Sequence, residues 1–178
     1  VDISHQGVIE RENNVLLEEI SAFFYLQALW KMFGMTKSVH FLPATGCSNV
    51  PMFANLLLGW GLKFIVVLDD DKAGRTVYKE LQESRVANTE DLLKITGCNG
   101  IEDLFSPNTF AKVVLKQASL KLTDNPAEHM KKTGLSKPVV ASEFFIGVEN
   151  GTITKDSLDR ASIGKIEELL SRIDARLV

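Results

Sequence analysis

The sequence predicts an α/β fold, a mostly parallel sheet flanked by helices. Short apolar runs alternate with segments of helical periodicity, as expected when helices connect parallel strands. The clearest run, Lys63–Leu68, is β-branched and apolar on both faces, which is typical of a strand in the middle of a parallel sheet. Ligands of such sheets bind at the carboxyl ends of the strands, so the residues that follow the strands are the first candidates for a functional site.

The remaining elements of the core are predicted by the same alternation. The first strand is expected at 15–17, the second at 39–42, and a weaker fourth at 92–95. Residues 21–33 have apolar side chains at helical spacing, and Gly34 is a plausible end for that helix. A second helix is expected over 50–58, capped by Ser48 and ended by Gly59, and a third over 75–84.

From about Pro107 onward the pattern is mostly helical, which predicts a helical C-terminal extension. Helices are expected at 142–148 and at the amphipathic stretch 163–177, with loops around 124–126 and 150–151. No shift in composition marks a hard boundary. We therefore expect a core over residues 13–106 that is completed by residues 107–178 of the same domain.

Composition excludes several classes of protein. With 178 residues, 45% hydrophobic and 24% charged, the chain has the content of one ordinary soluble domain. The longest apolar runs fall far short of the roughly 20 residues of a membrane span, so we expect no membrane association and a cytoplasmic location. The two cysteines form no CxxC pair, the three histidines follow no zinc spacing, and the net charge of −3 argues against a broad basic nucleic-acid surface.

An acidic triplet, Asp69-Asp70-Asp71, directly follows the central strand, and Glu18 ends the first one. Carboxylates this close repel one another, and a hard cation such as Mg²⁺ removes that cost because it prefers carboxylate oxygens. On this path Asp69 and Asp71 can point the same way while Asp70 faces elsewhere. The alternative is a solvated acidic turn that caps the following helix. A further acidic pair, Glu102-Asp103, either adds metal ligands or marks a helix N-terminus.

These residues carry a resemblance to a known family. Leu68–Gly74 resembles the Asp-x-Asp-x-x-Gly motif of topoisomerase-primase (TOPRIM) domains, and Leu17–Ser21 resembles their glutamate motif. Four further segments are similar to nucleases of the overcoming-lysogenisation-defect (OLD) family: Phe41–Asn49, Leu57–Lys63, Ile101–Ser106 and Ser136–Ala141. The resemblance covers about residues 13–175.

The resemblance implies a TOPRIM-like fold and a metal-dependent DNA endonuclease with Glu18, Asp69, Asp71 and Lys137 as catalytic residues. It implies Mg²⁺ or Mn²⁺, two ions in all, with Glu18, Asp69 and Asp71 as ligands of one and Glu102 and Asp103 of the other. Lys137 is implied to offset charge developing in the reaction. An ATPase domain is expected upstream of this piece, which does not begin with Met and has no phosphate-binding loop, and a homodimer is possible through that missing region.

The sequence departs from the family pattern at two positions: Glu19 stands where the family has Gly, and Ala22 stands where it has an acid. An acid at Ala22 would lie one helical turn beyond Glu18 and face the same site. A catalytically degenerate TOPRIM domain with an assembly or regulatory role is therefore one alternative. A phospho-acceptor receiver-like signalling domain, which also combines acidic strand ends with a late Lys-Pro, is a second.

Overall fold

The computed structural model describes residues 11–178, and a four-stranded parallel sheet lies at the centre of this part of the chain. Its strands are β1 (Asn14–Leu17), β2 (His40–Pro43), β3 (Phe64–Asp69) and β4 (Leu92–Ile95), in the order β2-β1-β3-β4. Each neighbouring pair is parallel, with Leu17 opposite both Pro43 and Val67. The predicted α/β fold is confirmed, and the strand expected to be central pairs on both sides.

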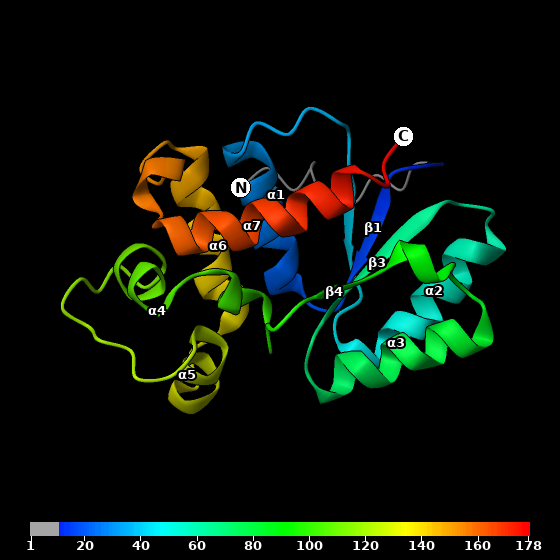
Figure 1. Ribbon diagram of the computed structural model, residues 1–178, viewed down its shortest axis with the longest axis horizontal. Coiled ribbons are helices and arrows are strands. Elements are labelled where there is room, and N and C mark those ends of the chain that lie inside the picture. The colour runs from blue at the N-terminus through cyan, green and yellow to red at the C-terminus, as the bar shows by residue number, and fades with distance from the viewer. Residues whose placement is uncertain (1–10) are drawn as a thin grey trace.

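Alternating side chains of the strands build two apolar cores, one on each face of the sheet. Leu16, Val66, Leu68 and Leu92 face the smaller core, which is closed by α2 (Val50–Gly59) and α3 (Lys72–Ser84). Val15, Leu17, Ile65, Val67, Leu93 and Ile95 face the larger core. Figure 1 shows α2 and α3 on one side of the sheet, and α1, α6 and α7 on the other. Because successive side chains of a strand point to opposite faces, this arrangement explains why the strands are apolar throughout.

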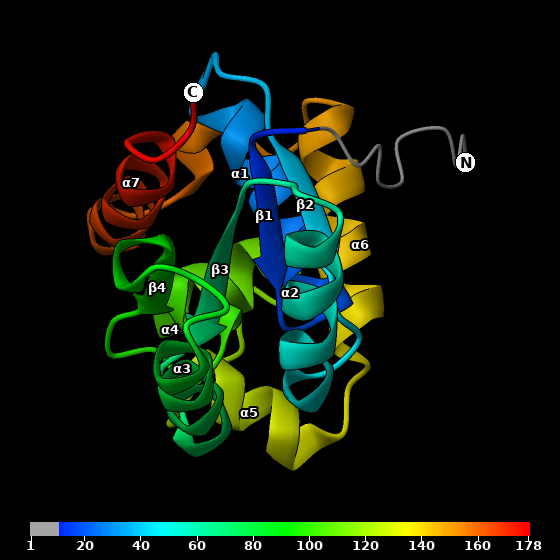
Figure 2. The same cartoon turned by 90° about the vertical axis from the view of Figure 1, so that its right-hand side faces the viewer.

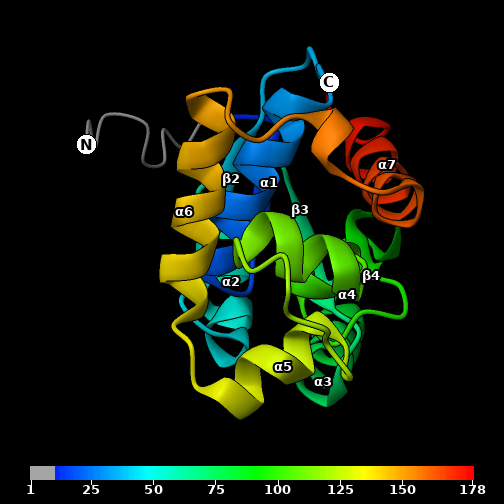
Figure 3. The ribbon, with the colours of Figure 1, turned by 90° about the vertical axis from the view of Figure 1, so that its left-hand side faces the viewer.

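The larger core is covered by α1 (Ile20–Met32) and by the helices of the C-terminal part. These are α4 (Pro107–Thr109), which continues as a π-helical turn over Phe110–Val114, α5 (Pro126–Thr133), α6 (Lys137–Glu149) and α7 (Arg160–Asp174). Helices α1 and α6 lie side by side in Figure 3, and the tilted rings of Tyr25 of α1 and Phe144 of α6 pack with their centroids 5.5 Å apart. The larger core thus contains residues from both 13–106 and 107–178, while the boundary at residue 106 stays a prediction.

Helix α6 begins earlier than the sequence pattern indicates, and α5 replaces part of an expected loop. Helix α6, expected at 142–148, begins at Lys137, and α5 begins at Pro126, where a loop was expected. Both have proline in the first turn, where its missing N–H is not needed and its fixed φ suits a helix. Proline marks the start of these helices, whereas the sequence pattern suggested a break.

Between residues 11 and 178, no helix is both long enough and apolar enough to cross a membrane.

Candidate active site

Glu18 and Asp69 meet at the carboxyl ends of β1 and β3, which are neighbours in the sheet. The backbone N–H of Asp69 donates a hydrogen bond to Glu18 Oε1 at 2.7 Å. Glu18 is buried, with 7% of its surface exposed, and the Cys47 thiol donates a second hydrogen bond to its carboxylate. The structure therefore brings together the first two predicted site residues.

The acidic triplet divides into three roles. Asp69 faces the site, whereas Asp70 turns away, accepts a hydrogen bond from the N–H of Gly97 at 3.2 Å and lies 3.3 Å from Arg75 and 3.9 Å from Lys94. The Gly97 N–H, together with Arg75 and Lys94, lowers the pKa of Asp70. Asp70 faces away from the cluster, as the strand-to-loop path predicts.

Asp71 caps helix α3, because its Oδ1 accepts a hydrogen bond from the Gly74 N–H at 2.7 Å. Its charge still acts on the site and contributes to the raised pKa of Glu18. One oxygen of Asp71 therefore caps the helix, which is the alternative role predicted from the sequence. The same carboxylate also lies near the cluster.

Glu102 joins the cluster from the 3₁₀ turn Ile101–Leu104 and is fully buried. Neither of its carboxylate oxygens has a hydrogen-bond partner within residues 11–178. Lys137 Nζ lies 3.6 Å from Glu102 Oε2 and 3.5 Å from Glu19 Oε2. Burying a carboxylate without hydrogen bonds lowers the stability of the fold. Because no N–H or O–H group of the described residues occupies its oxygens, Glu102 can still bind a cation.

Asp103 lies next to Glu102 in sequence but is directed elsewhere. Its Oδ1 accepts a hydrogen bond from the Ala127 N–H at 2.9 Å, and its Oδ2 accepts one from the Asn99 N–H at 3.0 Å. Because Ala127 lies in the first turn of α5, Asp103 anchors that helix and the loop before the 3₁₀ turn.

Two glycines make room for the acidic side chains. A Cβ on Gly74 would lie 2.1 Å from the Asp69 carbonyl oxygen and 2.9 Å from Glu18 Oε1. A Cβ on Gly100 would lie 2.7 Å from Glu102 Oε2 and 3.6 Å from Lys137 Nζ. These contacts explain the glycine in the Asp-x-Asp-x-x-Gly motif and the one before the Glu102-Asp103 pair.

The cluster contains more acidic groups than basic ones. Burial, followed by Glu18 and Glu102, raises the pKa of Asp69 to about 8, and burial also raises the pKa values of Glu18 and Glu102. Burial alone would lower the pKa of Lys137, but Glu102, Glu19 and Asp69 outweigh it, so Lys137 is a cation. One ammonium group thus faces several carboxylates, and a further cation would be favourable here.

The residues fit a hard divalent ion by their chemistry, because carboxylate oxygens are its preferred ligands and Glu102 offers two without hydrogen bonds. Across residues 11–178, however, no three acidic, cysteine or histidine side chains are arranged to hold one ion as they stand. Glu18 Oε1 faces the Asp69 amide, and Lys137 stands beside Glu102. Side-chain rotation of these groups is needed to complete a coordination shell.

Three residues near the cluster were not assigned to it from the sequence. Glu19 was noted as a departure from a family pattern, and the structure shows it as a partner of Lys137 and of the Ser21 hydroxyl. The Cys47 thiol donates a hydrogen bond to Glu18. Burial raises the pKa of Tyr25, and the nearby charge of Glu102 raises it further. The position of Glu19 beside Glu18 was a usable signal, whereas no sequence pattern indicated Cys47 or Tyr25.

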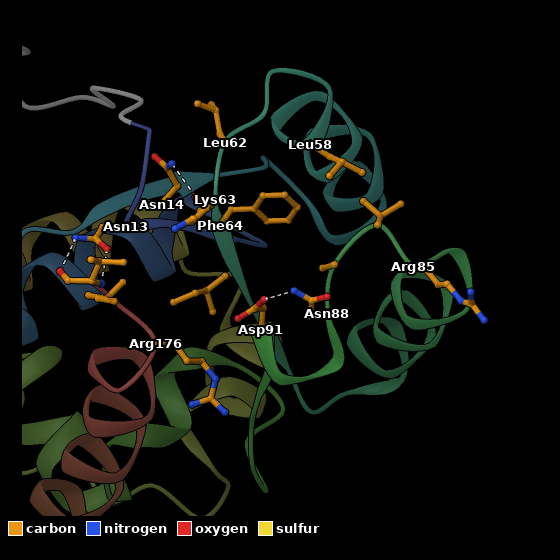
Figure 4. A pocket seen from close by; sticks show the side chains of 15 residues that line it. Asn13, Asn14, Leu58, Leu62, Lys63, Phe64, Arg85, Asn88, Asp91 and Arg176 are labelled. Atoms are coloured by element: carbon orange, nitrogen blue, oxygen red, sulfur yellow. Dashed lines mark hydrogen bonds between the residues drawn. The ribbon is translucent and has the colours of Figure 1, made fainter.

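A cavity of about 370 Å³ lies at the opposite end of the sheet. It is lined by Asn14 at the start of β1, Phe64 at the start of β3 and Asp91 just before β4. Figure 4 shows Asp91 hydrogen-bonded to Asn88, and Arg85 pointing away from the other labelled side chains. Since parallel α/β sheets bind ligands at the carboxyl ends of their strands, the acidic cluster, and not this cavity, is the candidate functional site.

The raised pKa values predict how the metal-free protein responds to pH. Folded Asp69 keeps its proton up to about pH 8, whereas in the unfolded chain it titrates near the ordinary value of 3.8. The folded state therefore binds more protons between these values, and this contribution to stability is lost as pH rises through 8. Glu18 and Glu102 act in the same direction.

We expect Asp69→Asn to raise the thermal midpoint in chelator at about pH 8.5, and this gain to disappear at about pH 4. Asp70→Asn is the matched control and should lower the midpoint near neutral pH, because the pKa of Asp70 is lowered and its folded-state interactions are lost. Equal midpoints for Asp69→Asn and the unmodified chain at both pH values would contradict the assigned electrostatics.

Neither a protein-family model nor a curated protein matches this sequence. Among solved structures, the C-terminal region of the Burkholderia pseudomallei OLD protein is similar, with a TM-score of 0.51 and 14% sequence identity over 91% of this chain and 98% of that chain. At this identity the likeness concerns the fold, and it confirms the fold that the sequence resemblance implied. The chain has the fold of the C-terminal region of an OLD protein.

Proposed function

We propose that this chain is a divalent-metal-dependent endonuclease domain that hydrolyses phosphodiester bonds of DNA. The observation that carries the proposal is that Glu18 meets Asp69, and Glu102 meets Lys137, at the carboxyl end of a parallel sheet. Three carboxyl groups with raised pKa values share this end of the sheet with Lys137, and one lysine neutralises such a site poorly.

Glu18, Asp69 and Asp71 would hold one Mg²⁺ or Mn²⁺ ion. Glu102 would hold a second. Asp103 has both oxygens engaged by backbone N–H groups, so in this proposal it positions α5 and Glu102. Ions held there would supply an activated water molecule and stabilisation of the leaving oxygen.

Lys137 supplies a fixed positive charge next to the reacting phosphate. Its pKa is raised by Glu102, Glu19 and Asp69 against the effect of burial, so the ammonium group stays protonated. It can donate hydrogen bonds to the oxygens on which negative charge develops, a form of stabilisation that is stronger in a partly buried site than in water. Glu19 holds this lysine from the solvent side, with 44% of its own side chain exposed.

The larger protein context is part of the proposal. The similar solved structure is itself a C-terminal region of an OLD protein. We infer that an ATPase domain precedes this domain in the full polypeptide and that the missing region carries any homodimer contact. The net charge of −3 means that much of the DNA affinity must come from metal ions or from that region.

The test is cleavage of supercoiled plasmid in Mn²⁺ or Mg²⁺ by the unmodified chain, Asp69→Asn and Asp70→Asn. We expect weak, sequence-nonspecific nicking that is lost in Asp69→Asn and in Lys137→Ala, because phosphate contacts carry no base information. Asp70→Asn should retain it, since Asp70 faces away from the cluster. A thermal midpoint for each variant establishes that it is folded.

Other outcomes select the alternatives. Nicking that persists in Asp69→Asn in a clean preparation would falsify the assignment of residues. Metal binding without any nicking supports the degenerate domain with an assembly role. Covalent labelling of an aspartate by a small phosphodonor supports a receiver.

A further inference from the structure

A groove of about 630 Å³ runs from the acidic cluster along helix α5. Asp71 and Lys137 line it at the end next to the cluster, and Lys131 and Leu135 line it farther away. In Figures 2 and 3, α5 lies across the end of the molecule at which β1 and β3 finish. The groove is therefore continuous with the proposed catalytic site, and anything that fills it lies beside the reacting group.

Helix α5 is a fixed wall of this groove. Asp103, which is 3% exposed, accepts the Ala127 N–H, and Met130 is buried in the larger core. The helix ends at Gly134, whose φ of 65° reverses the chain and places Leu135 at the rim with 42% of its surface exposed. A rigid wall places its side chains at a constant distance from the cluster.

Neighbouring lysines of α5 have different surroundings. Lys132 lies 2.9 Å from Asp124 and 3.9 Å from Glu128, so its charge is already paired. Lys131 lines the groove, is exposed, and makes no ion pair with any residue between 11 and 178. Glu128 also lines the groove, but Lys132 partly neutralises it, so Lys131 is the unpaired cation of this wall.

We infer that this groove binds a short stretch of one DNA strand next to the scissile phosphate, with Lys131 contacting a phosphate oxygen and Leu135 contacting a sugar or base. The inference rests on the proposed function and names the form of its substrate. Two lysines, Lys131 and Lys137, match one or two phosphates of a single strand. A duplex needs a broader basic surface, which a chain of net charge −3 does not favour.

The test is binding of a fluorescent thymidine oligonucleotide of roughly ten nucleotides, a length within the site sizes of single-strand proteins. Anisotropy is measured with Ca²⁺ and with chelator, for the unmodified chain, Lys131→Ala and Lys132→Ala. One lost phosphate contact lowers the salt slope of log affinity by about 0.7, which corresponds to roughly a five- to tenfold weaker binding at about 50 mM salt. We expect this loss in Lys131→Ala, and Lys132→Ala to bind like the unmodified chain.

Lys131→Arg keeps the charge and should restore both affinity and slope, which a merely structural role of Lys131 does not predict. Where nicking is observed, Lys131→Ala should raise KM and leave kcat nearly unchanged. The binding measurement stands without cleavage, so absence of nicking in all variants defeats the proposed function and leaves this inference to be decided by affinity. Identical slopes for Lys131→Ala and Lys132→Ala, or tighter binding of a duplex of the same length, would overturn the single-strand assignment.

Discussion

Replacing Gly74 with alanine is expected to lower the free energy of unfolding by about 3 kcal/mol or more. The new Cβ would lie 2.1 Å from the Asp69 carbonyl oxygen, an approach that side chains do not make. Asp69 ends the central strand β3, so its backbone cannot move away without disturbing the sheet. The Cβ would also lie 2.9 Å from Glu18 Oε1, and rotating Glu18 away would remove its hydrogen bond with the Asp69 N–H.

The measurement is thermal or denaturant unfolding in chelator, and a loss of this size lowers the melting temperature by roughly 6–12 °C in a domain of this length. Gly164→Ala is the matched control, because Gly164 lies in α7 with no heavy atom within 4 Å of its Cβ position. Alanine there should stabilise the protein by up to about 1 kcal/mol, as in an ordinary helix. If Gly74→Ala melts like the unmodified chain, the close packing of α3 against Glu18 is not as described.

The position of Glu18 beside Asp69 was predictable from sequence because it follows from strand order and pairing. Both residues directly follow apolar runs, and parallel neighbouring strands end at the same edge. The strand β4 was predicted at 92–95, and it lies there. Helix α3 was expected from Arg75 and begins at Lys72, because Asp71 serves as its N-cap.

The other half of the site depends on tertiary packing that no local pattern reveals. Glu102 and Lys137 meet only because α6 packs along α1 and brings its first turn over the 3₁₀ turn of Glu102. Glu102 and Asp103 are adjacent acids, yet one faces the cluster and the other anchors α5. Sequence reasoning could place both acids near the site, but it could not tell which one has free oxygens.

Replacing Ala22 with aspartate is expected to tighten metal binding by about tenfold, and by up to about 100-fold if the new oxygen contacts the ion directly. Ala22 is the third residue of α1, 9% exposed, and lies four residues after Glu18, which directly precedes the N-cap Glu19. An acid in the first turn of a helix also interacts favourably with the helix dipole. Nicking in Mn²⁺ should increase together with affinity.

The same substitution should destabilise the metal-free protein. Ala22 packs in the larger core, and a carboxylate there adds to a cluster in which Glu18, Asp69 and Glu102 already have raised pKa values. We expect a loss of about 1–3 kcal/mol without metal, the usual cost of a buried polar group with incomplete hydrogen bonding. The signature is therefore paired: a lower melting temperature in chelator and a larger rise on adding Mn²⁺.

Ala22→Asn separates the effect of charge from that of volume, because asparagine has nearly the same shape as aspartate but no charge. It should destabilise the protein without a gain in metal affinity. Glu19→Gly addresses the other departure from the family pattern. In the structure Glu19 Oε2 is engaged by Lys137 and by the Ser21 hydroxyl, so this oxygen of Glu19 is not free to replace the one missing at Ala22. Unchanged metal affinity in Ala22→Asp combined with weaker binding in Glu19→Gly would reverse this assignment, because Glu19 would then be the ligand and Lys137 would have to leave it when metal binds.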